Sequence, residues 1–193
     1  MEEKKELDKK EYLDLTEDCF ESQSHNWNPL RAWFHTSRNS IVANCVKKYY
    51  KKGDKIADLG CGNCLWNTEG IPVIGIDLNK KMMEYAKKKG KLKSYYVSDL
   101  NNTPLRSNSL DLVVITETLE HIKDYKKTIE EIKRILKPNG IVITTVPYDT
   151  NFSLWKPLFA VQCFIEGNIL RKERYLKKGG HVNNFSPESI KKE

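Results

Sequence analysis

The chain has 193 residues, of which 39% are hydrophobic, so it is long enough for one well-buried core and too short for two ordinary domains. Its charged start, Met1–Lys5, and the lack of any apolar run near the ~20 residues of a membrane-spanning helix argue against a secretory signal or a transmembrane segment and predict a cytoplasmic protein with reduced cysteines. The net charge of +7 suits an anionic partner, such as RNA, a phosphorylated metabolite or an acidic membrane surface, without choosing among them.

The amino-terminal part of the chain predicts an arm followed by a helix. Residues 1–28 are polar and charged, which indicates a loosely ordered arm or a short helix, whereas residues 29–193 form the predicted folded domain. Apolar residues recur at helical spacing from Pro29 to Tyr50. This segment is therefore expected to pack one face on the body of the domain.

Five short apolar runs then alternate with helical patterns. We expect strands at residues 55–59, 73–77, 94–97, 110–116 and 141–146, and helices at 80–89 and 125–136. The turn at residues 60–63 is expected to open a further short helix, and residues 137–140 are expected to end the last helix. The alternation predicts an α/β fold with a mainly parallel sheet, whose ligand crevice lies beyond the carboxyl ends of the strands.

Glycines and acidic residues follow three successive predicted strands. Gly60 and Gly62, just after Asp58, allow a sharp turn and a close approach of the backbone to a ligand. Asp77 lies 19 residues beyond Asp58, which matches the roughly 20-residue interval at which a carboxylate on the second strand accepts both hydroxyls of a ribose. Asp99, after the third strand, would accept from an adenine amino group. Together these residues predict a nucleoside pocket.

Two other ligand classes fit the turn less well. A dinucleotide-binding turn needs a third glycine where this chain has Leu65, and Asp58 would be unfavourable beside a pyrophosphate. The pair Cys61 and Cys64 has the spacing of a redox dithiol or of half a zinc site. Because a second cysteine pair is absent and both residues lie within the glycine turn, we expect them to line that turn and to bind no metal.

The order of these motifs resembles that of the class I S-adenosylmethionine-dependent methyltransferases, in particular the group called type 11. The resemblance runs from about Trp33 to Glu188. Its most specific part is Ile56-Ala57-Asp58-Leu59-Gly60-Cys61-Gly62-Asn63, which is similar to the first motif of the family, with Asp77 in the acidic second motif. Residues 110–122 and 136–141 are similar to the fourth-strand segment and to the turn before the fifth strand. The implied fold is a Rossmann-like three-layer sandwich, and the implied cofactor is S-adenosylmethionine.

The resemblance also implies roles for individual residues. They are Asp58, Gly60, Cys61 and Gly62 beside the methionine moiety, Asp77 with Leu78 at the ribose, Asp99 with Leu100 at the adenine, and Thr116 with Glu117 in the reaction cleft. Arg38 is similar to an arginine that meets the methionine carboxylate in part of the group. A purely structural alternative stays open, in which Trp33 and Phe34 are core anchors and Arg38 is a surface residue.

The chain departs from the family pattern in two places. Cys64 stands where the family commonly has another glycine. Related domains follow a segment like residues 181–188 with a helix and an antiparallel strand pair, so we expect this sheet to lack the last two of the usual seven strands. An exposed fifth strand, or residues 147–175, would then recruit a second copy of the chain as a homodimer. The alternative is a truncated product that keeps cofactor binding without turnover.

The expected chemistry is in-line methyl transfer, which needs no covalent enzyme intermediate. For a hydroxyl acceptor, His121 and Glu117 are candidate general bases, because the fourth-strand exit faces the sulfur end of the cofactor. Apolar and basic residues at 147–180 predict a lid over a small or amphiphilic, lipid-linked acceptor; a helix that merely packs on the sheet is the alternative. RNA methylation, which lacks a recognisable RNA-binding module here, and non-catalytic cofactor binding are the competing functions.

Overall fold

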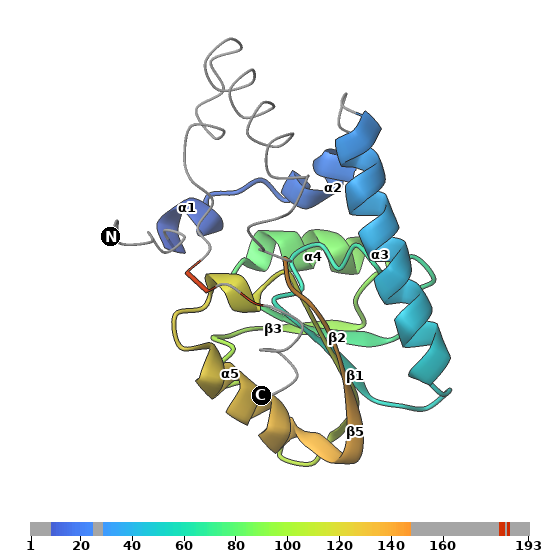
Figure 1. The fold of residues 1–193 in the computed structure, drawn as a ribbon, viewed down its shortest axis with the longest axis vertical. Coiled ribbons are helices and arrows are strands. Elements are labelled where there is room, and N and C mark those ends of the chain that lie inside the picture. The colour runs from blue at the N-terminus through green and yellow to red at the C-terminus, as the bar shows by residue number, and fades with distance from the viewer. Residues whose placement is uncertain (1–8, 25–28, 148–181, 184, 186–193) are drawn as a thin grey trace.

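A computed structural model describes residues 9–24, 29–147, 182, 183 and 185 of the chain. Within these residues, five parallel strands form one sheet in the order β3-β2-β1-β4-β5 (Figure 1). The strands are β1 (Ile56–Leu59), β2 (Val73–Asp77), β3 (Ser94–Val97), β4 (Leu110–Thr116) and β5 (Leu136–Thr145). The predicted parallel α/β sheet is confirmed, and the described part of the sheet has five strands, as expected.

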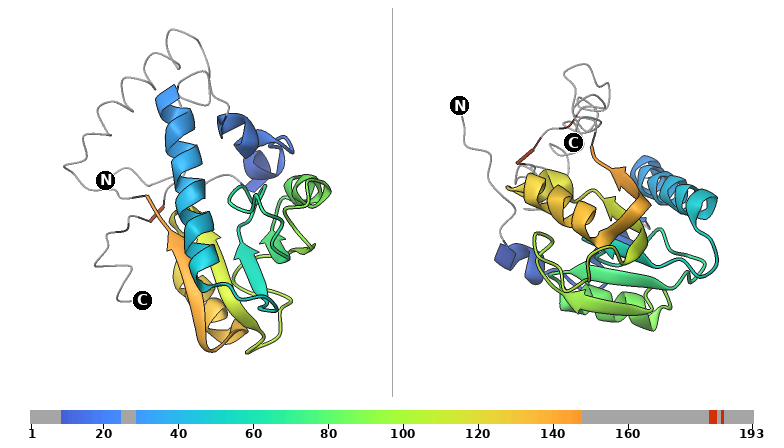
Figure 2. Two further views of the ribbon diagram at one scale, coloured as in Figure 1. Left: turned by 90° about the vertical axis from the view of Figure 1, so that its right-hand side faces the viewer. Right: turned by 90° about the horizontal axis from the view of Figure 1, so that it is seen from below.

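Helices cover both faces of the sheet (Figure 2). One core cluster joins Val42 and Val46 of α3 (Pro29–Tyr49) and Met83 of α4 (Lys80–Lys88) to the sheet. The second cluster joins Ile132 and Ile135 of α5 (Tyr125–Ile135) to the opposite face. The fold is therefore a three-layer sandwich in which the central strands are covered on both sides.

Residues alternate between the two core layers along β1. Ile56 faces the layer of α3 and α4, whereas Ala57 and Leu59 face the layer of α5. All four residues of β1 are buried, which explains why this strand is a short, nearly continuous apolar run interrupted by Asp58 alone. A carboxylate in the centre of such a strand is costly to bury, so its presence points to a role for Asp58 beyond packing.

An amino-terminal arm lies over the carboxyl ends of β1 and β2, above α4 (Figures 1 and 2). The arm contains two short helices, α1 (Lys9–Leu13) and α2 (Cys19–Ser24), and leads into the long helix α3. Residues 9–24 are called the arm. The sequence predicts at most one short helix in this region, and the structure has two.

One local prediction is wrong and another is confirmed. No helix follows the glycine turn: residues 61–70 form successive turns, and the Asn67 side chain joins the backbone of Ile71 to that of Lys91 through hydrogen bonds of 2.8–3.0 Å. As predicted, the last helix ends before residues 137–140, because α5 stops at Ile135. Residues 137–140 form an irregularity within β5, where the register shifts between Leu110 and Leu112 of β4.

Most of the carboxyl-terminal region lies outside the described residues. The proposed acceptor lid at residues 147–180 lies, apart from Pro147, outside the described residues. Among the described helices, none is long and apolar enough to cross a lipid bilayer. Strand β5 is an edge of the described sheet, and Val142 on it is 42% exposed.

Candidate functional site

The glycine turn after β1 closes against the exit of β2. The amide nitrogens of Gly60 and Cys61 donate to the carbonyl of Ile76 at 2.8 and 3.3 Å. Gly60 and Gly62 have positive φ angles of 69° and 44°, a region that glycine enters at no steric cost. A β-carbon at position 60 would lie 2.5 Å from Oγ1 of Thr118, so the absence of a side chain lets the turn touch the β4 exit.

Asp77, at the end of β2, is the most heavily hydrogen-bonded carboxylate at these strand exits. Its Oδ1 accepts from the Tyr12 hydroxyl and from the Asn79 amide, both at 2.8 Å, and its Oδ2 accepts from the Gly62 amide at 2.8 Å. Burial raises the pKa of Asp77, and these three donors oppose that rise. The side chain is only 2% exposed, because the arm covers it.

Asp58 lies beneath the turn and is 1% exposed. Its Oδ2 accepts from the indole nitrogen of Trp66 at 2.8 Å, whereas its Oδ1 has no hydrogen-bond partner among the described residues. Burial raises the pKa of Asp58 to about 7. An unpartnered carboxylate oxygen inside a protein is unfavourable, so Asp58 is a site that a donor group on a ligand would stabilise.

The exit of β3 places Asp99 in solvent and Leu100 in the core. Oδ1 of Asp99 accepts from the Asn101 amide at 2.8 Å, and the Leu100 side chain packs within the α5 layer, 8% exposed. Asp99, Asp77 and the glycine turn thus lie at the same edge of the sheet, because β3, β2 and β1 are parallel neighbours. This is the arrangement that the sequence predicts.

The exit of β4 meets helix α3 through an ion pair. Nη1 of Arg38 lies 2.9 Å from Oε2 of Glu117, and both side chains are about one quarter exposed. Glu117 has a φ of 49°, and its amide donates to Thr145 of β5 at 2.9 Å, so it sits in a left-handed position directly after Thr116. Arg38 therefore reaches the predicted cleft, whereas Trp33 is 64% exposed and is not a core anchor.

Next to this ion pair lies the short helix η1 (Leu119–His121), which carries a buried acid and the predicted histidine. Glu120 is 1% exposed, its Oε2 has no partner among the described residues, and burial raises its pKa to about 8. Nε2 of His121 lies 3.8 Å from Oε1 of Glu120, and the His121 side chain is 31% exposed. Glu117, Glu120 and His121 are thus gathered at one strand exit.

The two cysteines of the turn are buried free thiols. Burial raises the pKa of both Cys61 and Cys64 well above the usual range, which disfavours the thiolate that redox chemistry and metal binding require. Within the described residues, no group of three or more His, Cys, Asp or Glu side chains has an arrangement that would hold a metal ion.

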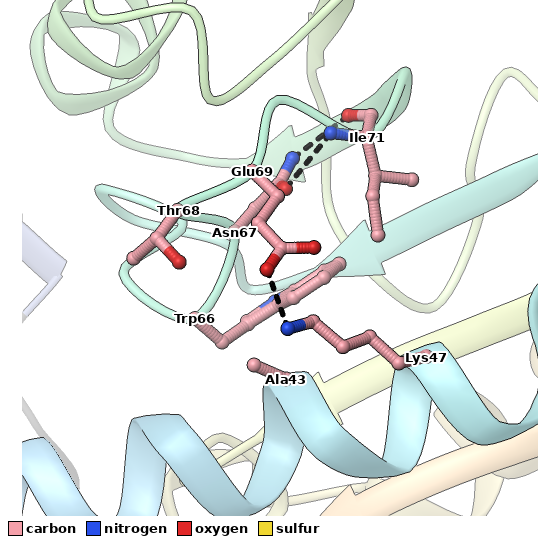
Figure 3. Close-up of a pocket in the computed structure, with 7 residues that line it drawn as sticks. All are labelled: Ala43, Lys47, Trp66, Asn67, Thr68, Glu69 and Ile71. Atoms are coloured by element: carbon pink, nitrogen blue, oxygen red, sulfur yellow. Dashed lines mark hydrogen bonds and ion pairs between the residues drawn. The ribbon is translucent and has the colours of Figure 1, made fainter.

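A small cavity lies behind the turn, next to α3. It is lined by Ala43, Lys47, Trp66, Asn67, Thr68, Glu69 and Ile71 (Figure 3). Its volume of about 10 Å³ is room for about one water molecule, so it is too small for a nucleoside. A larger hollow of about 200 Å³, which Asp111 and Lys137 line, lies at the opposite edge of the sheet, where these two charges pair at 2.7 Å. Neither cavity is the predicted pocket.

Sequence reasoning missed three residues that shape the site. Trp66 binds Asp58, Tyr12 binds Asp77, and Glu120 is the buried acid of the β4 exit. Glu120 had a signal, since it directly precedes the predicted His121. Tyr12 had none, because 65 residues separate it from Asp77 and the arm has no clear apolar pattern.

The chain is similar to known methyltransferases. Residues 57–144 match the family model described as "Methyltransferase domain". A ubiquinone biosynthesis O-methyltransferase of Pelagibacter ubique is 34% identical over 127 residues, which cover 61% of this chain and 52% of the relative. A demethylmenaquinone methyltransferase of Staphylococcus saprophyticus is 28% identical over 183 residues, which cover 86% of this chain and 78% of the relative.

Among solved structures, an S-adenosylmethionine-dependent methyltransferase of Thermotoga maritima, described as a possible histamine N-methyltransferase, shares the fold. Its TM-score is 0.60 at 20% identity, with 90% of this chain and 77% of that chain covered. The matched region spans about half the length of the first curated relatives, 52% and 50%. The comparison with these relatives therefore covers about half of each protein and not the whole enzyme.

Proposed function

We propose that the chain is a class I S-adenosylmethionine-dependent methyltransferase and that it transfers a methyl group from S-adenosylmethionine to a small lipophilic acceptor. The observation that carries the proposal is the meeting of Gly60, Asp77 and Asp99 at one edge of the parallel sheet, within the matched residues 57–144. Parallel α/β sheets bind their ligands at this edge.

The residues at this edge fit the cofactor. Asp58 has a buried oxygen without a partner among the described residues, which suits the ammonium group of the methionine moiety, and Asp77 suits a ribose diol. Gly60 and Gly62, which adopt positive φ angles, carry no side chains of their own, so the backbone of the turn can approach a ligand closely. When bound, S-adenosylmethionine supplies a methyl group that its positively charged sulfur activates for displacement.

The residues of the β4 exit are proposed to handle the acceptor. The ion pair of Arg38 and Glu117 holds α3 against this exit. Arg38 would orient the carboxylate of the cofactor, and Glu117 would orient the acceptor. His121 is the proposed general base for a hydroxyl acceptor, because its ring is partly exposed beside the cleft. Glu120 lies 3.8 Å from that ring, but burial raises its pKa to about 8, so it would supply a negative charge to the His121 imidazolium only as the pH rises toward 8.

The proposed acceptor is a quinone precursor or a similar aromatic lipid. The supporting observation is that relatives from two groups carry the names ubiquinone biosynthesis O-methyltransferase and demethylmenaquinone methyltransferase. Such acceptors need an apolar covering, and residues 147–180 are the proposed lid that would provide it.

We also propose that the chain acts in the cytoplasm and forms a homodimer through the edge of β5. Small-angle scattering in solution would test the dimer.

Calorimetric titration with S-adenosylhomocysteine tests the cofactor site. Asp77→Asn should weaken binding about one-hundred-fold, because a ribose diol loses hydrogen bonds to a charged acceptor. Asp111→Asn, at the opposite edge of the sheet, is the matched control and should bind like the unchanged chain. Equal affinities for the two variants would exclude the site. Transfer of labelled methyl to demethylated quinols, compared with transfer to RNA, then tests the acceptor class.

A further inference from the structure

The arm occupies the hydrogen-bonding sites that the proposed cofactor requires on Asp77. A carboxylate offers about four acceptor positions, two on each oxygen. The Tyr12 hydroxyl and the Asn79 amide fill both positions of Oδ1, and the Gly62 amide fills one position of Oδ2. At most one position remains, but a ribose diol presents two hydroxyl groups. The Tyr12 hydroxyl therefore competes directly with a ribose hydroxyl.

Further contacts hold the arm over the turn. Nδ2 of Asn79 donates to the Tyr12 carbonyl at 2.9 Å, so the same asparagine that caps α4 also anchors α1. The Asn63 side chain donates to the carbonyl of Glu17. The ring of Phe20 lies over Gly62, where an added β-carbon would stand 3.2 Å from it. The arm is thus bound along the whole turn, not at Tyr12 alone.

A salt link secures the end of the arm. Nζ of Lys91 lies 3.5 Å from Oε1 of Glu21 in α2, and this lysine follows α4. The pKa of Glu21 is lowered, chiefly by its hydrogen bond from Tyr85 of α4. These side chains fix the end of the arm to α4 and to Lys91, just beyond it. The bonds to Asp77, Asn79 and Asn63 point toward the strand exits, where the cofactor is proposed to bind.

We propose that the arm is an intramolecular gate, in which the Tyr12 hydroxyl substitutes for a ribose hydroxyl on Asp77 and S-adenosylmethionine binds only after the arm has moved away. The inference rests on the proposed function of the Asp77 site. A closed fraction of molecules lowers the apparent affinity for the cofactor in proportion to the open fraction that remains. The arm then sets how much cofactor is needed for activity.

The variant Tyr12→Phe tests the gate, because it removes the competing hydroxyl and keeps the ring. We expect its affinity for S-adenosylhomocysteine, measured by calorimetry on the full chain, to rise about ten-fold, since one hydrogen bond to a charged group is lost from the closed state only. Tyr49→Phe removes a hydroxyl at the far end of α3 and is the matched control. Its affinity should equal that of the unchanged chain.

Amide hydrogen exchange reads the position of the arm without relying on affinity. If the arm is a gate, amide exchange at residues 9–24 becomes faster when S-adenosylhomocysteine binds. This exchange is already faster in Tyr12→Phe without ligand. Slower exchange on binding, together with weaker binding by Tyr12→Phe, would mean that the arm closes over the cofactor and would overturn the gate. Equal affinity and unchanged exchange in Tyr12→Phe would also overturn it and leave the cofactor site standing. Failure of both chains to bind would reject the proposed function itself.

Discussion

The indole nitrogen of Trp66 donates to Asp58 at 2.8 Å and fixes one oxygen of a carboxylate that is 1% exposed. The other oxygen has no partner among the described residues. Hydrogen bonds from the neutral donors Trp66 and Cys64 lower the pKa of Asp58 but do not offset the cost of burying its charge, so this pKa rises to about 7. The turn thus holds a titratable group that is only half satisfied.

Asp58 should make stability depend on pH. An unfolded aspartate ionises near pH 4, whereas folded Asp58 ionises near pH 7. Between these values the folded chain holds a proton that the unfolded chain has released, so the free energy of unfolding falls as the pH rises. The full effect amounts to as much as about 4 kcal/mol. Urea unfolding from pH 4.5 to pH 8 measures it.

The variant Asp58→Asn should lack this contribution. We expect it to gain stability relative to the unchanged chain as the pH rises toward 8, because an amide has no charge to bury. Asp14→Asn, at an exposed position of the arm, serves as the control and should follow the unchanged chain at every pH. If Asp58→Asn and the unchanged chain showed parallel pH curves, Asp58 would not be protonated in the folded state.

The strand exits could be predicted from the sequence, because they depend on short patterns. Strand β2 is a buried apolar run that Asp77 ends, and Asp99 follows the half-exposed edge strand β3 by two residues. The side chains that contact the acidic residues of the site could not be predicted in this way. Trp66 and Tyr12 reach it from loops and from the arm, where tertiary contacts alone decide the conformation, and the helix expected after Gly62 is replaced by turns for the same reason.

Gly60→Ala should be more harmful than its backbone angle alone implies. A φ of 69° costs an alanine about 1–2 kcal/mol, and its β-carbon would also collide with the Thr118 side chain. The collision adds about 1–3 kcal/mol, as in other overpacked sites. Thermal and urea unfolding measure the sum.

Gly90→Ala separates the two contributions. Gly90 has a similar φ of 73° but no atom within 4 Å of an added β-carbon, so this variant should show the backbone cost alone. Replacing Thr118 by Ala in the Gly60→Ala chain should recover part of the additional loss. If Gly60→Ala and Gly90→Ala lowered the free energy of unfolding equally, the β-carbon at position 60 would not collide with Thr118 at the β4 exit.

Arg38 and Lys47 lie on the same helix, and each pairs with an acid on a loop, Glu117 and Glu69. Only Arg38 stands at the strand exits. If it holds the carboxylate of the cofactor, Arg38→Gln should weaken S-adenosylhomocysteine binding about ten-fold or more, through the loss of a charge-assisted hydrogen bond. Lys47→Gln should leave the affinity unchanged. If both variants changed the calorimetric affinity by a similar, small amount, Arg38 would only hold α3 in place and would not bind the cofactor.

Glu131 of α5 supports the loop after β3 from beneath. Its Oε1 accepts from the Thr103 amide at 2.7 Å and from the Thr103 hydroxyl at 2.6 Å, and Arg134 donates to both of its oxygens at 2.7 Å. Chiefly through the hydrogen bonds from Arg134, the pKa of Glu131 falls to about 2. The same loop carries Asp99, so this buried carboxylate connects the stability of α5 to the proposed adenine site.

Glu131→Gln should therefore destabilise the chain by about 2 kcal/mol at pH 7, because the charge that Arg134 pairs with is lost. A lowered pKa gives stability that is complete above the usual glutamate range and is lost as the pH falls toward 2, so the difference between the two chains should shrink from pH 5 to pH 3. Glu130→Gln, at the exposed neighbouring position, is the control. A difference that stays constant with pH would show that Glu131 acts through its shape and not its charge. Weaker binding of S-adenosylhomocysteine by Glu131→Gln at pH 7 would in addition show that the loop contributes to the cofactor site.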